Sequence, residues 1–157
     1  MENQLTILAE SLEQKIAVLA EIQEYNKRQE QVFLAETVDM SGFDEAVEEK
    51  GRLIEQLSRL DDGFEILYAK LSEQLRNNRS KYAAEIRGLQ QQIATITEMS
   101  VTIQAQESRN KQLIEQYFAK ERDGIRQNRK NSKAVYDYYK KVNNASYAPP
   151  QLYDTKK

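Results

Sequence analysis

Residues 43–68 read FDEAVEEKGRLIEQLSRLDDGFEILY, and the spacing of their apolar side chains decides the fold. Apolar residues recur every three or four positions, which is the period of an α-helix with one apolar face. That face carries Phe43, Val47, Leu53, Leu57, Leu60, Phe64, Leu67 and, just beyond the stretch, Leu71. The phase is kept across Asp61-Asp62-Gly63, so the spacing predicts one unbroken helix through this glycine.

The same period extends in both directions along the chain and predicts three helices, over residues 3–36, 42–76 and 80–119. The apolar face of the first helix consists of Leu5, Leu8, Leu12, Ile16, Leu19, Ile22 and Phe33. The apolar face of the third consists of Ile86, Leu89, Ile93, Ile96, Ile103, Leu113, Ile114, Tyr117 and Phe118.

Short polar residues mark the expected helix ends. Ser41 is the predicted N-cap of the second helix, with Asp44 in the reciprocal position of a capping box. A turn is expected over residues 76–80, where asparagines tolerate the conformation that ends helices and Ser80 can cap the third helix. The alternative is one helix over residues 43–118, in which the slip of phase near the asparagines is a coiled-coil stutter.

Several polar residues fall at positions that continue the apolar seams of the first and third helices. Such residues weaken a strict coiled coil and help to fix the alignment of helices with their partners. The predicted polar seam residues are Asn26, Gln29, Ser100, Glu107 and Asn110.

These features predict an all-α fold, an elongated antiparallel three-helix bundle or coiled coil with a partly helical C-terminal tail. Residues 1–119 are the expected bundle, and residues 120–157 are the expected basic, tyrosine-rich tail. The tail has ten Lys or Arg and four acidic residues, a net charge of +6, whereas the first 119 residues carry −8. The prolines at 149 and 150 should end any helix before them.

The tail contains aromatic and apolar residues that are candidates for binding a partner protein. Tyrosine combines a large apolar contact area with a hydrogen-bonding tip, which suits interfaces. The candidate partner-binding residues are Ile125, Val135, Tyr136, Tyr138, Tyr139 and Val142. The alternative is that one or two of the tyrosines fold back onto the bundle as ordinary core. Nucleic acid is not an expected partner, because the acidic bundle would repel phosphates and no base-reading fold is recognisable.

The composition argues against catalysis and against a bound cofactor or metal ion. The chain contains no Cys and no His, so thiol chemistry, zinc thiolate sites and the usual general base are absent. The isolated glycines form no phosphate-binding loop, and we expect no small-molecule ligand. The N-terminus has no signal-peptide pattern and no stretch suits membrane insertion, so we expect a cytoplasmic protein that is not an enzyme.

Two stretches of this sequence resemble the FlgN-type flagellar export chaperones. In residues 43–68, an acid-acid-Lys run precedes regularly spaced leucines, as in the second helix of that family. The matching residues are Glu48, Glu49, Lys50, Leu53, Ile54, Leu57 and Leu60. Residues 103–118, IQAQESRNKQLIEQYF, resemble a later helix of the family through Asn110, Leu113 and Ile114. The resemblance covers roughly residues 1–120.

The resemblance implies a cytoplasmic chaperone of the flagellar type III export system. Such chaperones bind the C-terminal helices of hook-associated proteins, prevent their premature assembly and deliver them to the cytoplasmic domain of the export gate. A seam interrupted by polar residues could exchange one internal helix contact for such a cargo helix. A monomer or weak dimer is expected. The alternatives are a self-associating coiled-coil scaffold and a FliT-type chaperone for another flagellar cargo.

Overall fold

The computed structural model describes residues 2–120 and 137–138, and the helices in this part of the chain have the predicted all-α arrangement. Helix α1 spans Glu2–Leu34, α2 spans Met40–Asn77 and α3 spans Ala83–Lys120. A turn separates α2 from α3, so the alternative of a single helix over residues 43–118 is wrong. Helix α2 continues without interruption through Gly63, as its apolar phase predicted.

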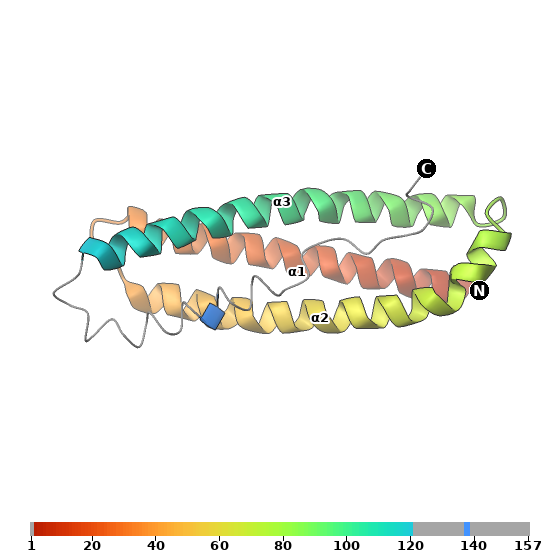
Figure 1. Ribbon diagram of the computed structural model, residues 1–157, viewed down its shortest axis with the longest axis horizontal. Helices are drawn as coiled ribbons and strands as arrows, with labels where there is room; N and C mark the ends of the chain where they lie inside the picture. Colours follow the sequence, from red (N-terminus) through yellow and green to blue (C-terminus); the bar gives the residue numbers. More distant parts are fainter. Residues whose placement is uncertain (1, 121–136, 139–157) are drawn as a thin grey trace.

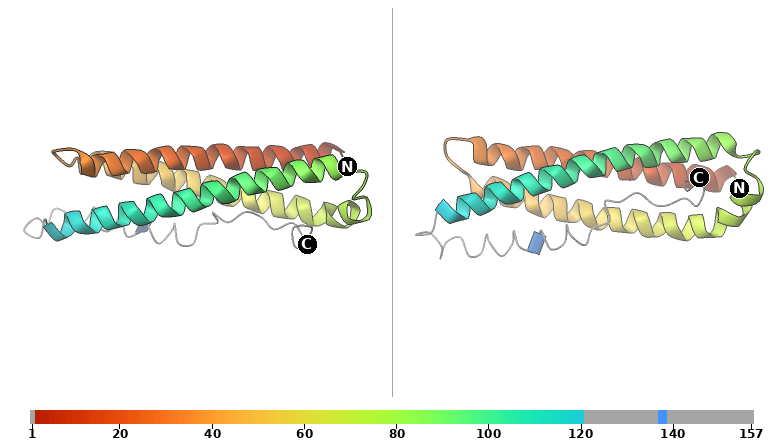
Figure 2. Two further views of the ribbon diagram at one scale, coloured as in Figure 1. Left: turned by 90° about the horizontal axis from the view of Figure 1, so that it is seen from above. Right: turned by 45° about the horizontal axis from the view of Figure 1, so that its top comes forward.

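The three helices lie side by side in an elongated bundle (Figure 1). Helix α2 runs antiparallel to α1 and α3, which point in the same direction. Helix α1 packs along both of the others, whereas α2 and α3 make few close backbone contacts with each other. Helix α1 therefore provides most of the close backbone packing with both α2 and α3, and Figure 2 shows the three helices from two further directions.

The core is a seam of side chains spaced alternately three and four residues apart. In α1 it includes Leu5, Leu8, Leu12, Leu19 and Ile22, in α2 Phe43, Val47, Ile54, Leu57 and Phe64, and in α3 Leu89, Ile93, Ile96, Ile103 and Ile114. Full burial of each such aliphatic side chain is worth roughly 1.5–3 kcal/mol. The seam explains why a chain with so few apolar residues folds: it needs only two positions in every seven.

The core differs from the predicted apolar faces at two lysines. Lys15 is buried in α1 and the neighbouring Ile16 is only half-buried, so the seam passes through the lysine. In α2 the seam passes through Lys50 and Ile54, and Leu53 is half-buried. Both helices keep the regular three-four spacing of buried residues, and at these two positions the buried residue is a lysine.

The predicted capping residues of α2 and α3 are wrong by a few positions. Asp39 is the N-cap of α2, and its carboxylate accepts hydrogen bonds from the backbone N–H of Ser41 at 3.0 Å and from the Ser41 hydroxyl at 2.6 Å. The bond from the Ser41 hydroxyl, and to a smaller extent the bond from its backbone N–H, lower the pKa of Asp39. Ser80 lies within the turn before α3, where the Tyr82 N–H donates to the Asn78 carbonyl at 3.1 Å.

Candidate functional site

Lys50 of α2 is fully buried, with no exposed side-chain surface, and it is the centre of the candidate site. Its ammonium group donates to Asn26 Oδ1 at 2.5 Å, Gln29 Oε1 at 2.6 Å and Glu107 Oε1 at 2.8 Å. A lysine ammonium has three N–H donors, so all three are used. The acceptors come from α1 and α3, and Lys50 therefore links all three helices at one level of the bundle.

A second set of hydrogen bonds joins α1 directly to α3 at this level. The Asn110 side-chain amide donates to the Asn26 carbonyl at 3.0 Å, and the Asn26 side-chain amide donates to Gln106 Oε1 at 3.1 Å. All five predicted polar seam residues are buried, and four of them, all but Ser100, meet in this network. We call Asn26, Gln29, Lys50, Glu107, Asn110 and Tyr138 the Lys50 cluster.

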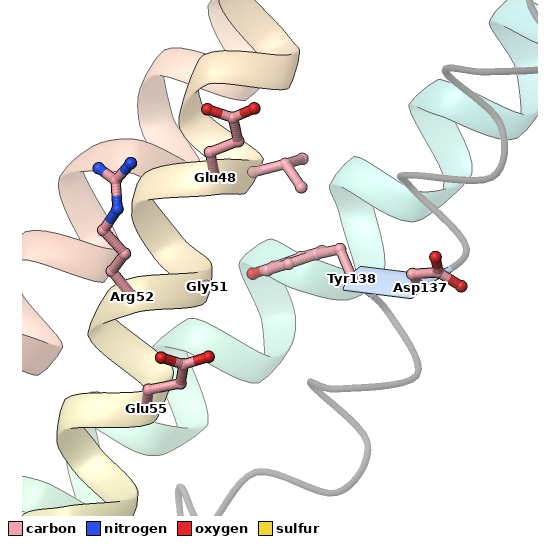
Figure 3. A pocket seen from close by; sticks show the side chains of 7 residues that line it. Glu48, Gly51, Arg52, Glu55, Asp137 and Tyr138 are labelled. Atoms are coloured by element: carbon pink, nitrogen blue, oxygen red, sulfur yellow. The ribbon is translucent and has the colours of Figure 1, made fainter.

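Tyr138 completes the cluster from a distant part of the sequence. Its side chain is buried, its hydroxyl donates to Glu107 Oε1, and the Lys50 ammonium lies 4.2 Å from the centroid of its ring. Glu107 Oε1 therefore accepts from both Lys50 and Tyr138. In Figure 3 the Tyr138 ring points toward α2 near Gly51, while Asp137 points away from it. For Tyr138 the structure therefore agrees with the alternative that one or two of the tail tyrosines fold back onto the bundle.

Burial sets the electrostatics of the cluster. Desolvation lowers the pKa of Lys50 to about 8, and the nearby Glu107 carboxylate opposes this shift. A buried ammonium is stable only when it is paired with an opposite charge and its donors are satisfied. Both conditions are met here, because Lys50 and Glu107 carry opposite charges and the amide oxygens take the remaining donors.

Some polar atoms of the cluster have no hydrogen-bond partner among the described residues. They are Glu107 Oε2, Gln29 Nε2 and Asn110 Oδ1, and all three are buried. An unsatisfied buried polar atom usually costs about 1–3 kcal/mol. The cluster therefore retains capacity for a further donor at the carboxylate of Glu107.

A pocket of about 340 Å³ lies beside Tyr138 on the surface of α2. Val47, Gly51 and Tyr138 contribute its less polar part, and Glu48, Arg52, Glu55 and Asp137 contribute charged side chains. Figure 3 shows Glu48, Arg52 and Glu55 along α2, with Tyr138 approaching from the other side. We call this the Tyr138 pocket. An apolar floor with charged edges suits the side of an amphipathic helix better than a small substrate.

The second buried lysine also pairs with a carboxylate on another helix. Lys15 of α1 forms an ion pair of 2.7 Å with Asp61 of α2, and the side chains are 2% and 14% exposed. We call it the Lys15–Asp61 pair. It lies within the bundle seam and does not line the Tyr138 pocket.

The structure separates the residues suggested by the family resemblance into three groups. Lys50 and Asn110 belong to the Lys50 cluster, and Leu57 and Ile114 belong to the apolar core. Leu53 and Leu113 are half-buried, Glu48 is exposed, and Glu49 pairs with Arg52 on the surface.

Of the predicted partner-binding residues, Tyr138 lies in the described part of the chain. The others, Ile125, Val135, Tyr136, Tyr139 and Val142, lie outside the described residues. Sequence reasoning missed the burial of Lys50 and Lys15, although the three-four spacing from Phe43 through Val47 leads directly to position 50.

The described residues contain neither a metal-binding cluster nor a membrane-spanning helix. Within residues 2–120 and 137–138, no group of three or more acidic, His or Cys side chains could hold a metal ion. None of the three helices there is long and apolar enough to cross a membrane.

Comparison with known proteins identifies one family. The family model described as FlgN protein matches residues 1–141, which include all three helices and Tyr138. No curated protein and no solved structure matches the chain.

Proposed function

Because the chain belongs to the FlgN family, whose members are chaperones of flagellar assembly, we propose that it binds the C-terminal helices of hook-associated proteins. It would keep these helices from assembling early and deliver their proteins to the cytoplasmic domain of the flagellar type III export gate. The site of action would be the cytoplasm. The match over residues 1–141 is the observation that carries this proposal.

The architecture is physically suited to a helical cargo. An amphipathic helix buries its apolar face most readily in a groove between two other helices. Here α2 and α3 lean on α1 and make few close contacts with each other, and the Tyr138 pocket opens beside α2. A cargo helix placed there would extend the three-helix seam without unfolding any of the helices.

The remaining contacts would come from the C-terminal part of the chain. Ile125, Val135, Tyr136, Tyr139 and Val142 are proposed to contact the cargo or the export gate, because they are apolar and aromatic residues within a basic segment. Tyr138 stands apart from this group, since its side chain is already buried against Lys50 and Glu107.

The proposal is tested by light-scattering chromatography of the full chain with each hook-associated protein of the same organism. We expect a 1:1 complex that requires the C-terminal helix of the hook-associated protein. The matched control is the same protein without that helix, which should not bind.

Two other outcomes would overturn the proposed cargo. A stable homodimer that binds no hook-associated protein would favour the coiled-coil scaffold. A complex with a different flagellar export substrate alone would favour a FliT-like cargo choice.

A further inference from the structure

Tyr138 occupies the bundle from outside the three helices that form it. It lies against Lys50 of α2 and Glu107 of α3, the two helices that contact each other least. The side of the bundle formed by α2 and α3 is thus closed, at the level of the Lys50 cluster, by a residue that belongs to neither helix.

The Lys50 cluster remains charge-balanced when Tyr138 is removed. Lys50 and Glu107 neutralise each other, and the three donors of Lys50 already have acceptors on α1 and α3. Tyr138 is neutral and adds a ring face and one hydroxyl donor. Its departure would therefore leave no uncompensated buried charge, which is the change that proteins tolerate least. The bundle can release Tyr138 without breaking the bonds that join its helices.

The position that Tyr138 fills has a definite chemistry. It accepts an apolar surface against Lys50 and a hydrogen-bond donor at Glu107, whose second carboxylate oxygen has no partner among the described residues. The adjoining Tyr138 pocket continues along α2 past Val47 and Gly51, with charged residues at its edge. An amphipathic helix with a hydrogen-bond donor on its apolar face matches each of these features.

We propose that Tyr138 and the cargo helix compete for this position, so that Tyr138 acts as an internal substitute for cargo and is displaced when cargo binds. The inference rests on the proposed function for the identity of the cargo helix. It also reassigns Tyr138, which the sequence alone placed among residues that contact the partner. Cargo can bind only the molecules in which Tyr138 has left this position. The apparent affinity for cargo is therefore the intrinsic affinity multiplied by the fraction of such molecules.

The first test is a set of binding titrations by isothermal calorimetry with a hook-associated protein that carries its C-terminal helix. If Tyr138 fills its position in about nine molecules out of ten, Tyr138→Ala should tighten binding about tenfold. Tyr138→Phe keeps the ring and loses the bond to Glu107, so it should tighten binding by a smaller factor. Tyr25→Ala, on α1 and away from the Tyr138 pocket, is the matched control and should leave the affinity unchanged.

The second test holds Asp137, and with it Tyr138, against α2. The chain has no cysteine, so Glu48→Cys with Asp137→Cys introduces one specific pair at two exposed residues that line the same pocket. A short bis-maleimide linker between the two cysteines should keep Tyr138 in its position. Cargo binding should then weaken at least tenfold, because few molecules reach the state that can bind cargo. The reference for this loss is the same double variant without the linker, so that the effect of linking is separated from the effect of the two substitutions.

The outcomes distinguish the two proposals. Unchanged or weaker binding by Tyr138→Ala, together with normal binding by the linked protein, would overturn the competition and leave the chaperone function intact. Binding to no hook-associated protein by the wild type or by any variant would overturn both. Tighter binding by the tyrosine variants and weaker binding by the linked protein would establish the competition.

Discussion

Lys15 of α1 and Lys50 of α2 are both buried at seam positions, and each is paired with a carboxylate on another helix. Their surroundings differ. The Lys15–Asp61 pair joins α1 to α2, and the Asp61 side chain is 14% exposed. Lys50 has three acceptors from two other helices and also faces the ring of Tyr138.

The difference shows that one residue type at one kind of position can serve two purposes. The Lys15–Asp61 pair can fix the register of two helices, because only one alignment brings its charges together. The Lys50 cluster fixes three helices and, in addition, provides a place for a residue from the C-terminal part of the chain. Its greater burial also makes it more sensitive to the loss of a single partner.

The largest expected effect is the loss of the carboxylate from the Lys50 cluster. Glu107→Gln leaves the buried Lys50 without an opposite charge and should lower the free energy of unfolding by about 3 kcal/mol. Asp61→Asn should cost about half as much, because the Asp61 side chain is 14% exposed and water can reach the pair. Urea unfolding of both variants checks the order. An equal or larger loss for Asp61→Asn would contradict the comparison.

The pH dependence of stability is the next largest effect. The pKa of Lys50 is about 8 in the folded protein and its ordinary value is 10.5, so between these values the unfolded chain binds more protons. Stability should therefore rise with pH from 8 upward, by about 1.6 kcal/mol up to pH 9.5, since each pKa unit corresponds to about 1.4 kcal/mol and folded Lys50 is still half protonated at pH 8.

The reference for this pH series is the double variant Lys50→Met with Glu107→Leu, which has no ionisable pair at that level. The rise should appear in the wild type relative to this variant in urea titrations at each pH. Parallel pH profiles for the two proteins would show that Lys50 is not the titrating group.

Removal of the Tyr138 hydroxyl should have a smaller effect. Tyr138→Phe loses a hydrogen bond to a charged acceptor and should lower the free energy of unfolding by about 1.5 kcal/mol. Tyr25→Phe, which changes a tyrosine on α1 that stacks with Arg28, is the matched control. A loss no larger than that of the control, measured by thermal and urea unfolding, would remove Tyr138 from the account of stability.

An exposed ion pair should show the smallest effect and thereby isolate the contribution of burial. Lys27 and Glu24 of α1 lie 3.2 Å apart, with side chains 60% and 65% exposed. Lys27→Gln should change the free energy of unfolding by less than about 0.5 kcal/mol. A larger change in urea unfolding would mean that charge alone, without burial, explains the effects at Lys50.

Much of the fold could be predicted from the period of the apolar residues. The three helices, the continuity of α2 through Gly63 and the burial of Asn26, Gln29 and Asn110 all followed from spacing. The buried lysines did not, because lysine is rarely fully buried and was treated as a surface residue. Strict three-four spacing would have placed Lys50 in the seam regardless of its type.

Two features could not be predicted for physical reasons. Asp39 and Ser41 are both short hydrogen-bond acceptors near the start of α2, and propensity alone does not choose between them. The contact of Tyr138 with Glu107 joins residues 31 positions apart, and no local period in the sequence reports which tyrosine of the tail reaches the bundle.

The most direct test of the central claim is the cost of Tyr138→Phe measured in two backgrounds by urea unfolding. In the wild type the substitution should lower the free energy of unfolding by about 1.5 kcal/mol. In the Lys50→Met/Glu107→Leu background it should lower it by nothing, because the groups that hold the phenol are gone, and the difference is the coupling energy. The same loss in both backgrounds would show that the Lys50 cluster does not hold Tyr138 on the bundle.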